Sequence, residues 1–200
     1  MASPLNFKTD IVPFLIATIG EYIALHYWLT YMDLEKFVLA NILLWVGFGI
    51  ERGSVAVWVS KVYRPKEGIT SSSVPLWQQL LGWTFITLTE IIIWIIWYYS
   101  IEPLGYLWST LILYVLMLIE HSAELGLVKR ENIFLHAKYL KTHFFTLMET
   151  LGAVGWIYFH QQGQDSWAMI SLIVGLSIEH IIQGSALKPD EPQPAIASTY

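Results

Sequence analysis

Six glutamates stand at a fixed spacing inside long apolar stretches, and they are the residues of this chain best suited to chemistry. They form three pairs, and the second glutamate of each pair follows the first by thirty residues. A carboxylate in hydrocarbon is costly unless it meets a proton, a cation or a hydrogen-bond donor, so such residues usually serve a function. The pairs are Glu21 with Glu51, Glu90 with Glu120, and Glu149 with Glu179.

The residues around each pair repeat as well. A threonine stands three residues before the first glutamate, and a tryptophan stands seven residues after it. On a helix these positions share a face with the glutamate. We therefore expect hydroxyl groups that orient the carboxylates by hydrogen bonds, and indoles that line a chamber beside them. The threonines are Thr18, Thr87 and Thr146, and the tryptophans are Trp28, Trp97 and Trp156.

The position directly after the second glutamate holds Arg52 in the first pair and histidine, His121 or His180, in the other two. Carboxylates and imidazoles form a hard ligand set that suits iron or manganese and, less readily, zinc. Glutamates on facing helices with a nearby histidine are also the general plan of di-iron carboxylate bundles. Arg52 would add a fixed positive charge that orients the carboxylates. The expected metal ligands are Glu21, Glu51, Glu90, Glu120, His121, Glu149, Glu179 and His180.

The spacing of the histidines departs from the di-iron plan, in which histidine follows glutamate by three residues. Here it follows directly, and adjacent residues diverge by about 100° around a helix. His121 and His180 are therefore placed to face the next pair instead of sharing a metal with the glutamate beside them. Glu124, one turn after Glu120, is a weaker candidate, either at an entrance to the site or as an extra ligand.

Charge limits what this acid layer can be. Six ionised glutamates against one arginine, Arg52, leave a net charge of −5 in a low-dielectric interior, which requires protons or cations. One hypothesis is a metal centre of di-iron or manganese type, with iron favoured, in an oxidoreductase for an apolar substrate. A second is a transporter or channel that moves protons or cations along the same glutamates. A third is a pigment- or haem-binding subunit of a membrane complex, and a fourth is a structural network of protonated glutamates bonded to threonine. The residues alone leave open whether the protein is an enzyme.

The elements that must position these residues are membrane helices. Of the 200 residues, 55% are hydrophobic and 15% aromatic, and the mean hydropathy is +0.51, values typical of a polytopic membrane protein. Cysteine is absent, which excludes disulfides and thiolate metal sites.

Six apolar runs of about 20 residues predict six transmembrane helices. They lie near 11–32, 37–59, 76–99, 104–127, 142–160 and 166–187. We expect an all-α integral membrane protein in which the six helices form three tandem helical hairpins with a pseudo-threefold internal repeat, over about 11–59, 76–127 and 142–187. Residues 1–187 would form a single domain, followed by a disordered cytoplasmic tail, 188–200.

Most lysines and arginines fall on the side of the termini and the long connections, which predicts that both termini are cytoplasmic in an inner or plasma membrane. The expected partners are the lipid bilayer, an apolar small molecule or an ion as substrate, and further copies or subunits of a membrane complex, with no nucleic acid. Gly47 and Gly175 each stand four residues before a second glutamate, so a neighbouring backbone can approach closely there.

Overall fold

The structure, a computed structural model, describes the backbone of residues 12–62, 76–129, 132 and 135–187, and the side chains of 12–55, 81–126, 132 and 135–186. This part of the chain is all-α, as predicted, and the predicted tail, 188–200, lies outside it. The elements are α1 (Val12–Asp33), α2 (Phe37–Val62), α3 (Leu76–Lys129), the short 3-10 helix η2 (His136–Lys138), α4 (Leu140–Gln161) and α5 (Asp165–Leu187).

The prediction of six transmembrane helices in three hairpins is wrong. The described residues form five α-helices, and four of them are long and apolar enough to cross a membrane: α1, α2, α3 and α5. The helix α4 is not among the four, because Lys141, His143, Glu149 and His160 lower the mean hydropathy of its 22 residues. The runs 76–99 and 104–127, predicted as two spans, both belong to α3, which is 54 residues long.

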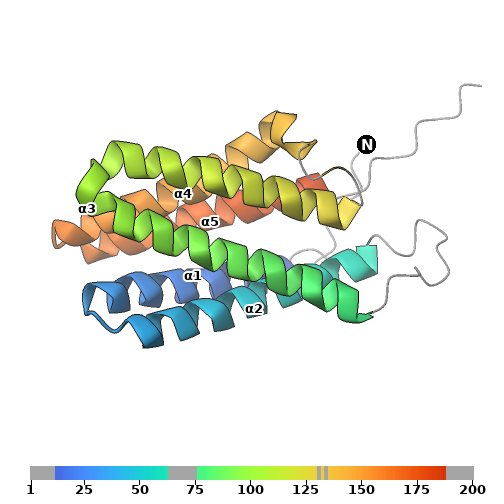
Figure 1. Cartoon of the computed structure of the whole chain (residues 1–200), viewed down its shortest axis with the longest axis horizontal. Coiled ribbons are helices and arrows are strands. Elements are labelled where there is room, and N and C mark those ends of the chain that lie inside the picture. The colour runs from blue at the N-terminus through green and yellow to red at the C-terminus, as the bar shows by residue number, and fades with distance from the viewer. Residues whose placement is uncertain (1–11, 63–75, 130–131, 133–134, 188–200) are drawn as a thin grey trace, which may run out of the picture.

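The helix α3 bends sharply at Gly105, which has φ 72° and ψ 170°. Only glycine adopts such a backbone without strain. The break predicted between residues 99 and 104 is helical, with Pro103 inside the helix, and the bend comes at Gly105. Beyond Gly105 the chain turns back, so that α3 has a first arm (76–104) and a second arm (105–129) lying beside each other (Figure 1).

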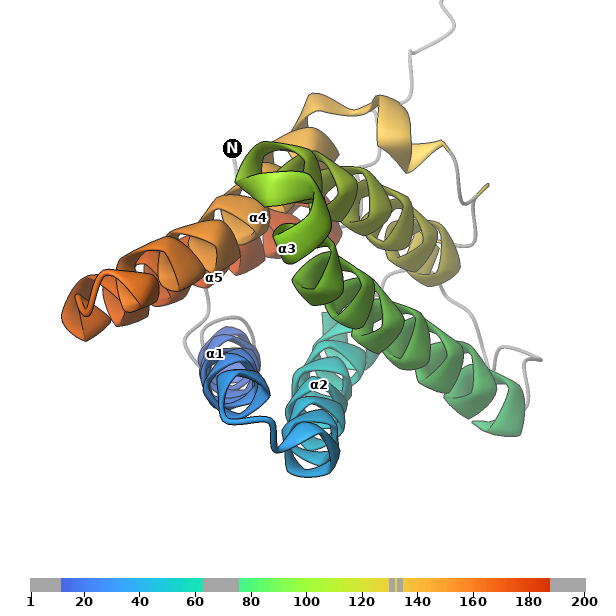
Figure 2. The same ribbon diagram turned by 60° about the vertical axis from the view of Figure 1, so that its left-hand side comes forward.

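The other helices form two close pairs, α1 with α2 and α4 with α5, as the end-on view shows (Figure 2). Glycine lets both pairs approach. A Cβ at Gly47 would strike the side chain of Ala24, and one at Gly175 would lie 2.7 Å from the Cα of Gly152. The predicted close approach at Gly47 and Gly175 is therefore confirmed.

Apolar residues flank the acid layer on both sides along the helices. The larger buried cluster contains four tryptophans, and the smaller one is centred on Val55, Leu125 and Phe145. Large apolar side chains such as Phe85 and Leu107 are also exposed on the outer surface, which fits helices surrounded by lipid. The tryptophans of the larger cluster are Trp28, Trp94, Trp97 and Trp156.

Candidate metal centre

All six predicted glutamates are buried together in the helix bundle. Their exposed fractions lie between 1% and 4%, and the side chains that follow the second glutamates are buried as well, at 3% to 5%. The thirty-residue spacing explains this, because it places each second glutamate at the depth of its partner once the chain has turned back. The buried set is Glu21, Glu51, Arg52, Glu90, Glu120, His121, Glu149, Glu179 and His180.

One contact occurs three times. The side chain after each second glutamate reaches the first glutamate of the next pair in the sequence, and the last pair reaches back to the first. The histidines therefore face the neighbouring pair, as expected, although His180 also lies in one candidate metal group with the adjacent Glu179, which the spacing did not predict. The distances are 2.7 Å from Arg52 Nη2 to Glu90 Oε2, 3.3 Å from His121 Nε2 to Glu149 Oε2, and 3.3 Å from His180 Nε2 to Glu21 Oε2.

Arg52 holds four carboxylates. Its Nη2 lies 2.7 Å from Glu90 and 2.9 Å from Glu120, its Nη1 lies 2.7 Å from Glu124, and its Nε lies 3.1 Å from Glu51. The two contacts of Nη2 are charge-assisted hydrogen bonds, which are the strong kind, and here they are shielded from water. One half of the acid layer therefore has a permanent cation.

Glu124 belongs to this half, although the sequence marked it only as a weaker candidate. It is fully buried and accepts a hydrogen bond of 2.8 Å from Nε2 of Gln183 in addition to its contact with Arg52. The available signal was its position one turn after Glu120, which places both carboxylates on one face of the second arm of α3.

Around Glu21 the layer contains two groups of residues that could each hold a metal ion, and one of them includes Glu90, which also contacts Arg52. In each group, one ligand atom from every residue lies within 4.8 Å of the others. Glu21 is a member of both groups, so its carboxylate lies between them. The first group is Glu21, Glu179 and His180, and the second is Glu21, Glu90 and Glu149.

The hydrogen bonds of His180 leave its Nε2 facing a carboxylate. Its Nδ1 is 3.0 Å from the carbonyl oxygen of Leu176 and 3.0 Å from Glu179. Both partners are acceptors, so Nδ1 must carry the proton of a neutral ring. The Nε2 of that ring then presents a lone pair to Glu21 at 3.3 Å.

His121 is arranged in the same way. The hydroxyl of Thr146 donates to the carbonyl of Thr142 at 2.8 Å, so it must accept from Nδ1 of His121, also at 2.8 Å. The Nε2 of a neutral His121 again directs a lone pair at a carboxylate oxygen, that of Glu149. Two lone pairs at this distance repel each other unless a proton or a metal ion lies between them.

Glu149 has the least satisfied carboxylate of the layer. It is 1% exposed, and neither of its oxygens accepts a hydrogen bond from the described residues. A buried carboxylate without donors is strongly disfavoured, since it has lost its hydration without compensation. A cation bound to the two carboxylate oxygens of Glu149 would compensate for the lost hydration.

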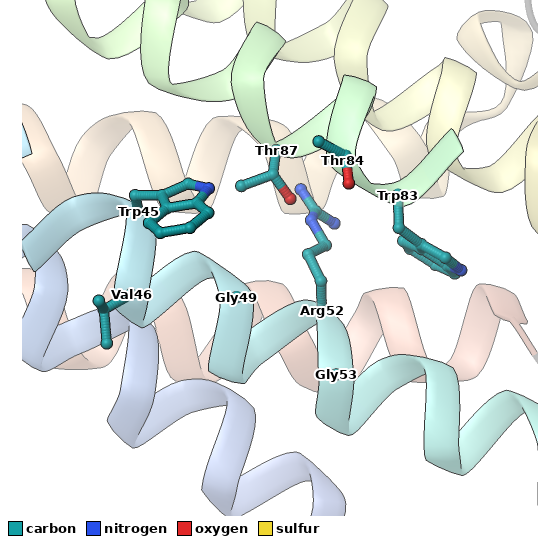
Figure 3. A pocket seen from close by; sticks show the side chains of 8 residues that line it. All are labelled: Trp45, Val46, Gly49, Arg52, Gly53, Trp83, Thr84 and Thr87. Atoms are coloured by element: carbon teal, nitrogen blue, oxygen red, sulfur yellow. The ribbon is translucent and has the colours of Figure 1, made fainter. Parts of the chain in front are cut away.

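The residues predicted to support the ligands have different surroundings. Thr146 orients His121, whereas Thr18 donates to the carbonyl of Phe14 on its own helix, at 2.9 Å. Thr87 lies beside Arg52 in the cavity of Figure 3. The three predicted tryptophans are packed in the larger apolar cluster and do not line that cavity, so a chamber lined by Trp28, Trp97 and Trp156 stays a prediction.

No family model, curated protein or solved structure matches this chain. The function is therefore argued from the geometry of the site.

Proposed function

We propose that this is an integral membrane protein that binds two divalent transition-metal ions in the acid layer, around Glu21. The orientation of the two histidines carries the proposal. Each histidine uses Nδ1 as a donor and turns Nε2 towards a carboxylate oxygen 3.3 Å away. The proposed ligands are Glu21, Glu90, Glu149 and Glu179 with His121 and His180.

The 3.3 Å between each Nε2 and its carboxylate oxygen suits one metal ion bound by both atoms. Nitrogen and oxygen ligands lie about 2.0–2.2 Å from a transition metal, so for ligand angles of about 90–110° the two atoms are roughly 3.0–3.5 Å apart. The Nδ1 donors also match the usual pattern of metal-binding histidines, in which the second ring nitrogen is fixed by a carbonyl, a carboxylate or another acceptor.

Charge supports two ions. The two candidate groups together contain four glutamates, which carry four negative charges when ionised. Two divalent ions supply four positive charges. Arg52 contacts the three remaining glutamates of the layer, Glu51, Glu120 and Glu124, and it also contacts Glu90 of the second group. The ligand set consists of hard oxygen donors and imidazole nitrogens, which favours iron or manganese over zinc.

The chemistry proposed for the centre is oxidation of an apolar substrate. A bound iron pair would supply redox chemistry with oxygen. The chain would hold the ions by its carboxylates, keep bulk water out through the two apolar clusters, and admit a substrate already dissolved in the bilayer. The apolar outer surface of the helices supports such a lipid-borne substrate.

Metal content of ligand variants tests the proposal. Glu21 is common to both groups, so Glu21→Gln should lose both ions, whereas Glu179→Gln should lose one. The matched control is Glu102→Gln, an exposed glutamate of α3 near its bend, which should keep the wild-type metal content. Elemental analysis of detergent-purified protein, grown with iron and separately with manganese, gives the stoichiometry.

The competing account is that protons bridge the histidines and carboxylates and that no metal binds. It predicts the same low metal content in wild type, Glu21→Gln and Glu102→Gln. It also predicts doubly protonated imidazole signals for His121 and His180 in nitrogen NMR spectra of the wild type, where the metal account predicts one protonated nitrogen per ring.

A further inference from the structure

A cavity of about 360 Å³ opens between α2 and the first arm of α3 (Figure 3). Both helices are apolar enough at this level to cross a membrane, so a cavity on their outer side would be reached from lipid. Its volume is in the range of small-ligand sites, about 300–1,000 Å³. One face of each helix forms it: Trp45, Val46, Gly49, Arg52 and Gly53 from α2, and Trp83, Thr84 and Thr87 from α3.

The glycines of this face are not used for helix packing. Gly49 and Gly53 are one turn apart, and a Cβ built on either would meet no atom within 4 Å. Gly47 is different, since its Cβ would strike Ala24 of α1. Small residues in membrane helices normally let another surface approach. At Gly49 and Gly53 that surface does not come from the described part of this chain.

The walls of the cavity are aromatic and its inner end donates hydrogen bonds. Trp45 and Trp83 lie on opposite sides of the Arg52 guanidinium, which points from α2 towards Thr87 (Figure 3). Arg52 is 5% exposed, and its Nε lies 3.1 Å from Glu51 without making a hydrogen bond to any described residue. The cavity lining therefore combines a flat glycine surface, two indoles and a guanidinium group, and it contains no carboxylate.

The charges around Arg52 select a neutral ligand. The guanidinium already lies within 3.1 Å of four carboxylates, so an anion at the same place would be repelled by them. A cation would meet the guanidinium itself before any carboxylate. A neutral carbonyl oxygen can accept a hydrogen bond from Arg52 or a threonine hydroxyl without either penalty.

We propose that this cavity binds a membrane-dissolved ring compound with a carbonyl oxygen, of the quinone class. The ring lies on Gly49 and Gly53 between the two indoles, and the carbonyl accepts a hydrogen bond at the inner end near Arg52 and Thr87. Binding does not require the metal centre. The ligand would nevertheless be close to it, because Arg52 contacts Glu90, a member of one metal group, at 2.7 Å.

Binding of a decyl-substituted benzoquinone to the full-length protein in lipid nanodiscs tests the proposal. Calorimetric titration gives the affinity, with decylbenzene as the probe that keeps the ring and chain but lacks the carbonyls. Gly49→Leu and Gly53→Leu fill the cavity without touching a neighbouring atom at Cβ. Gly184→Leu on α5 is the matched control, since its Cβ is equally unobstructed and it does not line the cavity.

The quinone should bind wild type and Gly184→Leu with equal affinity, and each filling variant should weaken it about tenfold or more through steric overlap. Equal binding of decylbenzene would overturn the proposal in favour of a lipid acyl chain, and unchanged quinone affinity in both filling variants would place the ligand elsewhere. Metal analysis of the same samples tests the metal proposal separately, because Gly49→Leu and Gly53→Leu should keep their ions even where they bind the quinone weakly.

Discussion

Gly175→Ala should destabilise the protein, because the added Cβ would overlap backbone atoms of α4. The new Cβ would lie 2.6 Å from the carbonyl oxygen of Met148 and 2.7 Å from the Cα of Gly152. Both atoms belong to the backbone of α4, so the two helices must separate. Overpacking of this kind costs about 1–3 kcal/mol, while alanine recovers about 0.5–1 kcal/mol of helix propensity. For a clash in the middle of that range, about 2 kcal/mol, the expected net loss is about 1–1.5 kcal/mol.

The matched control is Gly184→Ala on the same helix, where a Cβ meets nothing within 4 Å. It should gain about 0.5–1 kcal/mol. Denaturant titrations in detergent, followed by circular dichroism, give both values. If Gly175→Ala were as stable as Gly184→Ala, the close contact of α4 and α5 described here would be incorrect. The separation should also weaken metal binding, since Met148 directly precedes Glu149.

Three further outcomes follow from the ion contacts. Arg52→Met should lower the free energy of unfolding by about 3–5 kcal/mol, because it leaves buried carboxylates without their cation, and a loss below about 1 kcal/mol in the same titration would contradict that role. Glu124→Gln should also be destabilised yet keep its metal by elemental analysis, since Glu124 contacts Arg52 and lies in neither metal group. His160→Ala should cost less than about 1 kcal/mol, and less again in high salt, because His160 is 30% exposed where it contacts Asp33 and Asp165. A loss at His160 that is insensitive to salt would count against a screened ion pair.

The composition of the acid layer could be predicted from the sequence because its signal repeats. Glu21, Glu90 and Glu149 occur with the same neighbours at the same spacing, and a rise of about 1.5 Å per residue converts spacing into depth along a helix. The direction of the histidines followed from the same geometry. The close approach at Gly47 and Gly175 followed from residue size.

The helix count could not be predicted in this way. The gap between the apolar runs 76–99 and 104–127 predicted a loop, but the helix continues through Pro103 and the chain reverses at Gly105, where only the backbone angles reveal the bend. The apolar run 142–160 also predicted a membrane span, but α4 is less apolar than the four helices that could cross a membrane, and its threonines at positions 142, 146 and 150 are buried in the bundle. The gathering of four carboxylates around Arg52 depends on how α2 and both arms of α3 pack, which no single-helix pattern contains.

The central claim is that two metal ions share the carboxylate of Glu21, and the most direct test is the metal content of wild-type protein together with X-ray absorption at the metal edge. The account predicts about two iron or manganese ions per chain, with oxygen and nitrogen ligands at about 2.0–2.2 Å and a second metal about 3.5–4 Å away. Less than one equivalent of any transition metal in protein grown with a sufficient supply would contradict it.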